Sequence, residues 1–277
     1  MIIHLVDGTY ELFRHFYGIR RFKKTDPPFG AVSGVLSMVA QMLEDDATHV
    51  GVATDHIIES FRNTMWAGYK TGAGVERALL AQFTPLEEAL AAMGVTVWPM
   101  VELEADDALA SAAHLAAQDS RVEKVCIWTP DKDLAQCVVE DRVVQVDRRG
   151  GVIRDAAGVR AKFGVDPKFI PDYLALVGDA ADGYPGISGC GPKTAAQLIN
   201  RFGTLENFGP EVLNKENRRL ALLFKDLATL RTDAPLFKDV EELRWRGPTA
   251  DFPQFAEKMG SARLLMRIKK LAKRLSK

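Results

Sequence analysis

Long hydrophobic runs are missing from this chain. No window comes near the roughly 18 consecutive apolar residues of a membrane-spanning helix, so we expect no membrane span. The N-terminal residues lead straight into an apolar strand pattern, without the charged region, long apolar stretch and cleavage site of a secretory signal. Together these absences predict a cytoplasmic protein that has no membrane partner.

Cysteine is scarce as well. The three cysteines, Cys126, Cys137 and Cys190, form no CxxC spacing and cannot all pair with one another. Cys126 lies in an apolar, strand-like run, which favours a buried and reduced thiol. The cysteines therefore indicate neither a redox motif nor a complete set of disulfides.

An overall excess of charge is also absent. The net charge is −1, which says nothing about a nucleic-acid partner. The distribution of charge says more, because residues 251–277 contain eight basic residues and two acidic ones. Such a basic tail is usually the solvated face of a helix, but it also suits contact with a phosphate backbone.

Strand and helix patterns alternate through the first 150 or so of the 277 residues. This order predicts an α/β fold, with a central and mostly parallel sheet flanked by helices. The strand patterns are short and rich in Val and Ile, and they cover Ile2–Val6, His49–Thr54, Val95–Met100, Lys124–Thr129 and Val143–Val146. Apolar residues at helical spacing cover Ala31–Leu43, Glu76–Met93 and Asp106–Gln118.

The stretch from Phe61 to Ala81 does not fit this alternation. It combines basic, aromatic and glycine residues, a mixture that could touch a polyanion. Composition alone favours the simpler interpretation of a surface loop.

From about Gly164 the pattern changes to short helices separated by Gly and Pro. We therefore expect two domains, an α/β domain over residues 1–160 and a helical region over 161–277. The glycine-rich turn 186–191 leads into a helix near Pro192, whose free N–H groups can receive an anion. It lacks the GxxxxGK[ST] pattern of a Walker A loop. The turn is typical of a hairpin that holds a nucleic-acid backbone, although it could also be plain punctuation between helices.

Carboxylates follow many of the predicted strands and begin several helices. They are Asp7, Asp55, Glu104, Asp106, Asp107, Asp131, Asp133, Asp179 and Asp182. Each motif alone could be a turn or a helix cap. Acids at the ends of parallel strands meet at one edge of the sheet, however, and so many like charges need cations there. Oxygen ligands without His or Cys favour Mg²⁺ or Mn²⁺, and paired sites ~3.5–4 Å apart are typical of phosphodiester chemistry.

The motifs LVDGT, SFRN, GYK, ELEADDALA, TPDKDLAQ and GDAADGYPGISGCGPKTA occur in the order and spacing of a known family. Between about residues 2 and 235 the chain resembles the 5′-nucleases, which comprise flap endonucleases and the 5′→3′ exonuclease domain of bacterial DNA polymerase I. The resemblance implies a PIN-like nuclease domain followed by a helix-3-turn-helix region. Because no polymerase domain follows, we expect a free-standing form.

The resemblance also assigns roles to residues. It places Asp7, Asp55, Glu104, Asp106 and Asp107 at a tighter metal site, and Asp131, Asp133, Asp179 and Asp182 at a second one. Lys70, with Arg62 before it, would contact the scissile phosphate from the base of an arch over residues 62–95. The turn would hold duplex DNA, and K⁺ through its carbonyls, using Gly189, Gly191, Lys193 and Thr194.

The implied function is metal-dependent hydrolysis of DNA at 5′ flaps, ends or branches by a monomer, in functional association with a separate polymerase. A PIN-type ribonuclease and a non-catalytic, structure-selective DNA-binding protein are the alternatives. The chain departs from the family at Ala73, where an arginine is usual. Pro130 and the pair Gly183-Tyr184 also replace the usual residues.

Overall fold

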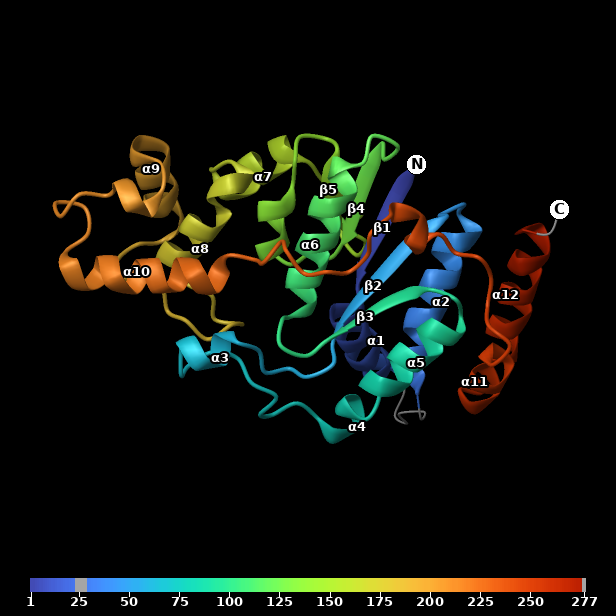
Figure 1. The fold of residues 1–277 in the computed structure, drawn as a ribbon. Coiled ribbons are helices and arrows are strands. Elements are labelled where there is room, and N and C mark those ends of the chain that lie inside the picture. The colour runs from blue at the N-terminus through green and yellow to red at the C-terminus, as the bar shows by residue number, and fades with distance from the viewer. Residues whose placement is uncertain (23–28, 276–277) are drawn as a thin grey trace.

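The computed structural model describes residues 1–22 and 29–275, with the side chains of residues 19–22 left out. Its centre is a six-stranded sheet in the order β3-β2-β1-β4-β5-β6 (Figure 1). All neighbouring strands are parallel except β6, which pairs antiparallel with β5. The strands are β1 Ile2–Asp7, β2 His49–Asp55, β3 Thr96–Met100, β4 Lys124–Trp128, β5 Val143–Asp147 and β6 Val152–Arg154. The predicted mostly parallel sheet is thus confirmed.

Helices cover both faces of this sheet. On one face lie α1 (Gly8–Phe22), α2 (Gly30–Glu44) and α5 (Phe83–Ala92), and α6 (Ala105–Gln118) lies on the other. Strand side chains alternate between the two faces, so Val6 packs into one core and Leu5 into the other. The two cores hold the strands in fixed register and so fix the edge where the strands end.

The segment between β2 and β3 contains short helices and extended chain. The helices α3 (Arg62–Met65) and α4 (Arg77–Leu80) flank a stretch without buried residues over 71–76. The single helix predicted over Glu76–Met93 is in fact α4 and α5, interrupted at Gln82, whose side-chain oxygen accepts the N–H groups of Ala31 and Val32. Of the arch range 62–95, α5 is therefore packed on the sheet and does not project from it.

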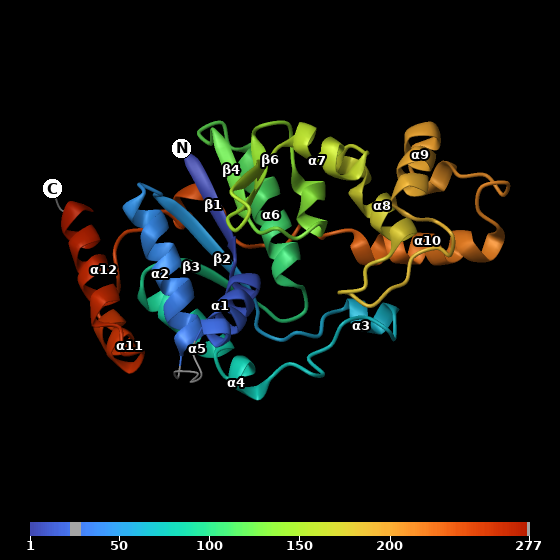
Figure 2. The ribbon, with the colours of Figure 1, turned by 180° about the vertical axis from the view of Figure 1, so that it is seen from behind.

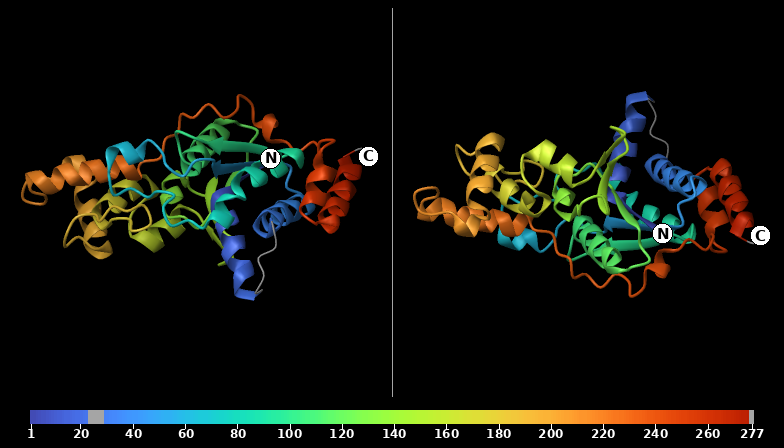
Figure 3. Two further views of the ribbon diagram at one scale, coloured as in Figure 1. Left: turned by 90° about the horizontal axis from the view of Figure 1, so that it is seen from below. Right: turned by 90° about the horizontal axis from the view of Figure 1, so that it is seen from above.

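A second body of helices lies beside the sheet (Figure 2) and has its own core. It contains α7 (Ala156–Phe163), α8 (Ile170–Val177), α9 (Pro192–Phe202) and α10 (Lys215–Ala228). Buried residues of α8 pack against buried residues of α10. This body and the C-terminal helices lie at opposite ends of the molecule (Figure 3).

The chain after α10 returns to the sheet. Ser111 on α6 bonds with the backbone of Arg231 and Ala234, and the Trp245 indole donates to the carbonyl of Met93 at 2.9 Å. The last helices, α11 (Phe252–Lys258) and α12 (Ala262–Leu275), then join the core formed by α2 and α5. Packing thus groups these helices with the sheet, which differs from the expected division at residue 160.

The predicted basic tail is largely α12. Leu264, Ile268 and Leu271 are buried against the rest of the protein, and Arg267 pairs with Glu44 at 2.8 Å. The other basic side chains of this helix are exposed, and Lys277 lies outside the described residues. Among the helices described, none combines the length and apolar character needed to span a membrane.

Candidate acidic active site

The sheet brings acids from distant parts of the chain to one edge. Asp7 and Asp55 are the last residues of β1 and β2, and Asp131 follows β4 closely. Because β2, β1 and β4 are adjacent and parallel, their carboxyl ends lie side by side. Glu104 caps α6 at the same edge, since Asp55 accepts the backbone N–H of Ala105 at 2.8 Å.

Backbone and hydroxyl donors hold the first group of acids. Asp7 accepts the backbone N–H of Tyr10 at 2.8 Å and the Thr129 hydroxyl at 3.0 Å. Burial, together with the negative charges of Asp55 and Asp131, nevertheless raises the pKa of Asp7 to about 7. Burial and the charges of Asp131 and Asp7 likewise raise the pKa of Asp106 well above its ordinary value. Such crowding of carboxylates is what a bound cation relieves.

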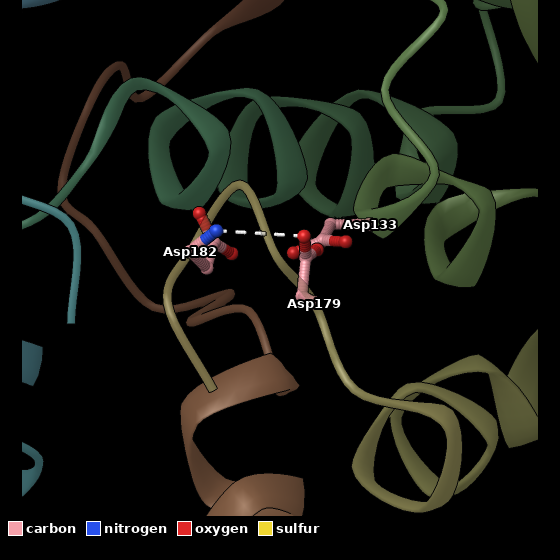
Figure 4. Close-up of side chains that lie close together, drawn as sticks. All are labelled: Asp133, Asp179 and Asp182. Atoms are coloured by element: carbon pink, nitrogen blue, oxygen red, sulfur yellow. Dashed lines mark hydrogen bonds between the residues drawn. The ribbon is translucent and has the colours of Figure 1, made fainter. Parts of the chain in front are cut away.

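The second group consists of Asp133, Asp179 and Asp182 (Figure 4). All three are buried, and one carboxylate oxygen of each lies within 4.8 Å of those of the other two. Asp179 accepts the backbone N–H groups of Ala181 and Asp182 at 2.9 and 3.4 Å. Within the described chain, Oδ1 of Asp133 has no hydrogen-bond partner. Burial and the neighbouring carboxylates raise the pKa values of Asp133 and Asp182.

Lys70 lies between the two groups. Its Nζ is 2.8 Å from Oε2 of Glu104 and 3.0 Å from Oδ1 of Asp182. Burial acts to raise the pKa of Glu104, but Lys70 and Arg62 outweigh it and lower that pKa. Burial acts to lower the pKa of Lys70, yet Asp182 and Glu104 raise it well above its ordinary value. The ammonium group therefore remains charged within the acidic site.

Arg62 and Asp107 are placed differently from the expectation. Arg62 is 1% exposed and makes two 2.7 Å bonds to the carboxylate of Asp107, which is fully buried. Its Nε donates to the carbonyl of Leu227 at 2.8 Å, while Asp107 also accepts the backbone N–H groups of Arg231 and Glu104. Arg62 also pairs with Glu104 at 3.2 Å. Because these contacts use the guanidinium and the Asp107 carboxylate, Arg62 is not open to a phosphate and Asp107 is held by Arg62 and by backbone N–H groups.

Two glycines allow the turn that carries Asp179 and Asp182 of the second group. Gly178 and Gly186 both have positive φ, and a side chain on Gly178 would lie 2.5 Å from the carbonyl of Pro185. The turn continues into α9, where Lys193 and Thr194 are exposed and Gly189 and Gly191 face open space. The four residues predicted to bind DNA are thus accessible, and along the chain they follow directly after the turn that carries Asp179 and Asp182.

The structure also shows polar partners that the sequence analysis missed. Lys132 forms an ion pair with Asp179, and the Ser60 hydroxyl donates to Glu104 at 2.6 Å. The role of Lys132 could have been inferred from the sequence, because it lies between Asp131 and Asp133. No sequence pattern around Ser60 indicates that it contacts Glu104. Ala73 is exposed, and with Arg62 buried, the exposed Arg77 is the candidate to replace the missing arginine.

A sheet with carboxylates along its edge, joined to a compact helical body, defines a class of nuclease, and comparison with known proteins identifies the family. Residues 2–164 match the N-terminal resolvase-like domain of 5′-3′ exonuclease, and residues 165–251 match its C-terminal SAM fold. The chain belongs to the 5′-3′ exonuclease family.

Relatives of two lengths are similar to this chain. The 5′-3′ exonuclease of Buchnera aphidicola (subsp. Baizongia pistaciae) is 32% identical over 83% of this chain and 81% of its own length. That of Aquifex aeolicus is 31% identical over 89% and 87%. DNA polymerase I of Pseudomonas aeruginosa is 34% identical over 86% of this chain, which spans only 28% of the polymerase.

Solved structures share the fold at lower sequence identity. The bacteriophage T5 5′-exonuclease superposes with a TM-score of 0.67 at 18% identity, covering 99% of this chain and 98% of the T5 chain. The catalytic core of Rad2 gives a TM-score of 0.64 at 16% identity, covering 97% and 91%.

Proposed function

We propose that this protein is a divalent-metal-dependent 5′-nuclease that hydrolyses phosphodiester bonds in DNA carrying 5′ flaps, ends or branches. The observation that carries the proposal is the convergence of two carboxylate groups on one sheet edge with Lys70 between them. Named 5′-3′ exonucleases among the relatives support the reaction, and Rad2 solved with a DNA substrate supports the choice of polymer.

The donor set fits hard divalent cations. The groups offer carboxylate oxygens only, and repulsion among these oxygens raises several of their pKa values. The unpartnered Oδ1 of Asp133 is the kind of buried acceptor that a cation site provides for. We propose Mg²⁺ or Mn²⁺ as the ions; the related T5 5′-exonuclease fold has been solved with zinc. When bound, such ions act as Lewis acids on a phosphoryl group.

Asp7, Asp55, Glu104 and Asp106 are proposed to hold one ion. Asp131, Asp133, Asp179 and Asp182 are proposed to hold the other. Asp107 supports the first set through its bond to the backbone N–H of Glu104 and its pair with Arg62.

The protein's own groups prepare the site for a phosphodiester. Lys70 keeps its charge and lies at the junction of the two carboxylate groups, so it can contact a phosphate oxygen there. The backbone of Tyr10 and the hydroxyl of Thr129 fix Asp7, which limits reorganisation when substrate binds. The surface around Lys193 would hold the duplex through its backbone, with K⁺ at the carbonyls of the turn.

Further parts of the proposal concern the setting of the enzyme. The matched polymerase relatives combine a similar segment with additional chain, which supports a functional link to a DNA polymerase. We propose that the protein acts as a monomer in the cytoplasm.

The test is cleavage of an end-labelled 5′-flap duplex with Mg²⁺, with EDTA, and by the Asp106→Asn variant. We expect the unaltered protein to give products near the flap junction with Mg²⁺ and none with EDTA. The Asp106→Asn variant should cleave at least about 100-fold more slowly. A single-stranded RNA of equal length serves as the competing substrate. Preferential cleavage of the RNA would favour a PIN-type ribonuclease, and binding without cleavage would indicate a non-catalytic DNA-binding protein.

A further inference from the structure

Tyr184 carries a buried hydroxyl that none of the contacts described above involves. The residue is 1% exposed, and among the described residues its hydroxyl has no hydrogen-bond partner. A buried donor without a partner destabilises a folded protein. Oδ1 of Asp133 is the matching case, a buried acceptor that also lacks a partner in the described chain. A donor and an acceptor are therefore left over in the same region of the molecule.

The backbone directs Tyr184 toward the second group of acids. Tyr184 and Asp179 form an isolated antiparallel bridge, with their two backbone bonds at 2.8 and 3.0 Å. Residues directly opposite in such a bridge have side chains on the same side, with Cβ atoms ~4.5–5.5 Å apart. The Tyr184 side chain therefore leaves the turn beside that of Asp179, which belongs to the cluster in Figure 4.

An aromatic contact fixes the tyrosine ring. The Tyr184 ring stacks on Phe224 of α10, with centroids 5.4 Å apart and an angle of 26° between the planes. Phe224 is itself buried in the core of the helical body. The ring is therefore held by apolar packing alone, and the hydroxyl is free for another task.

The hydroxyl of a tyrosine is protonated at neutral pH. A protonated hydroxyl near carboxylates can act as a hydrogen-bond donor to them.

We propose that Tyr184 is a positioning residue of the Asp133–Asp179–Asp182 site and that its hydroxyl donates a hydrogen bond to the Asp133 carboxylate when a divalent cation occupies the site. The bond orients Asp133 toward the cation, as outer partners of ligating carboxylates do. This inference rests on the proposed function, since it assumes that the three acids hold a cation.

The test compares Tyr184→Phe with the unaltered protein in the absence of DNA. Titration with Mn²⁺, followed by electron paramagnetic resonance, counts the bound ions and gives the affinity of each class of site. We expect Tyr184→Phe to weaken one class by about 10-fold or more and to leave the other unchanged. Tyr173→Phe is the matched control, because Tyr173 is a buried tyrosine of the same core that packs against Phe163.

A measurement without metal tests whether the Tyr184 hydroxyl lacks a partner in the metal-free protein. In EDTA, Tyr184→Phe should unfold at the same or a higher temperature than the unaltered protein, because the variant loses an unpartnered buried hydroxyl and keeps the ring. A lower unfolding temperature in EDTA would show that the hydroxyl already has a stabilising partner without metal, and that result would overturn the proposal.

A double-mutant cycle identifies the partner. In an Asp133→Ala background, adding Tyr184→Phe should change Mn²⁺ affinity by less than about 2-fold, because the acceptor is already removed. Equal effects of Tyr184→Phe in both backgrounds would contradict the bond to Asp133. Unchanged Mn²⁺ binding by Tyr184→Phe would overturn the inference and leave the nuclease intact, whereas no Mn²⁺ binding by the unaltered protein would count against the proposed function itself.

Discussion

Asp106 and Asp107 are neighbours in the sequence and have opposite environments. Asp106 lies among like charges that raise its pKa, whereas Asp107 is bound by the guanidinium of Arg62 and by two backbone N–H groups. Consecutive residues of a helix point about 100° apart, as 3.6 residues per turn requires, so adjacent acids can face different surroundings. One of these acids is thus suited to a cation and the other to a buried ion pair.

This contrast predicts opposite effects on the stability of the metal-free protein. Asp107→Asn should lower the free energy of unfolding by about 3 kcal/mol, because Arg62 would remain buried with only its longer 3.2 Å pair to Glu104 to balance its charge. The matched variant Asp106→Asn should leave that free energy unchanged or raise it, because it removes a repelled charge. Urea denaturation in EDTA at pH 8 measures both. Equal losses for the two variants would show that the acids play the same role.

For individual residues, the sequence indicated which acids lie near one another but not which contacts each acid makes. Strand ends are readable, so Asp7 and Asp55 could be assigned to one edge before the fold was known. The inward turn of Asp107 depends on Arg62, Leu227 and Arg231, which meet only after the helical body has packed. Tertiary contacts of this kind leave no local pattern in a sequence.

Among the elements, the first turn of α9 is the part that we propose to contact the DNA backbone. Pro192 begins the helix, so Lys193 and Thr194 carry N–H groups that the helix itself leaves free. Both residues are exposed, and the adjoining Gly189 and Gly191 leave room for a phosphate to approach. This arrangement favours recognition of the DNA backbone and not of its bases.

Lys193→Ala should therefore weaken DNA binding about equally for different sequences. It should also reduce the slope of log affinity against log salt by about 1, as expected for the loss of one phosphate contact. Lys238→Ala is the control, since Lys238 is exposed on the segment that returns to the sheet. Fluorescence anisotropy over a range of KCl concentrations measures both quantities. An effect confined to one DNA sequence would contradict a backbone contact.

Most strands and helices with a strong apolar periodicity could be predicted from the sequence. Elements with a weak or interrupted pattern could not. The five predicted strands all occur, within a residue or two of their predicted ends. The strand β6 was missed because it has only three residues on an exposed edge, and α1 because Gly8 after Asp7 resembles a turn. The break between α4 and α5 depends on Gln82, whose bonds to α2 are long-range.

Across the whole molecule, acid should destabilise the fold partly through His4 in the central strand. The Trp128 indole donates to Nδ1 of His4 at 3.1 Å, which requires a neutral ring. Burial, with a smaller contribution from His49, lowers the pKa of His4 from 6.5 to about 4. Between these values the unfolded chain binds a proton that the native chain does not, so stability falls as the pH drops from 6.5 toward 4.

Comparison with His4→Phe isolates this effect. Between pH 7.5 and 4.5, the unaltered protein should lose about 2 kcal/mol of unfolding free energy relative to the variant, because only the former must keep an imidazole neutral. Urea denaturation in EDTA at both pH values measures the difference, and the crowded carboxylates, common to both proteins, cancel. Parallel pH dependence of the two proteins would rule out this role for His4.

Packing crosses the expected division near residue 160 for a physical reason. Composition changes near Gly164, shortly before α8, although α7 and residues from Ala135 onward already belong to the core that α8 to α10 share. Nothing in the composition signals that the chain later leaves this body, because α11 and α12 are amphipathic helices like those before them. Only their packing on α2 and α5 shows where they belong.

The return of the chain to the sheet affects the order in which the protein can fold during synthesis. The core beside α2 contains residues from β1 at one end of the chain and from α12 at the other. A ribosome therefore delivers the whole helical body before it delivers the last side chains of that core. The helical body, whose core is formed almost entirely by residues 135–228, can fold while the older half of the protein is still incomplete.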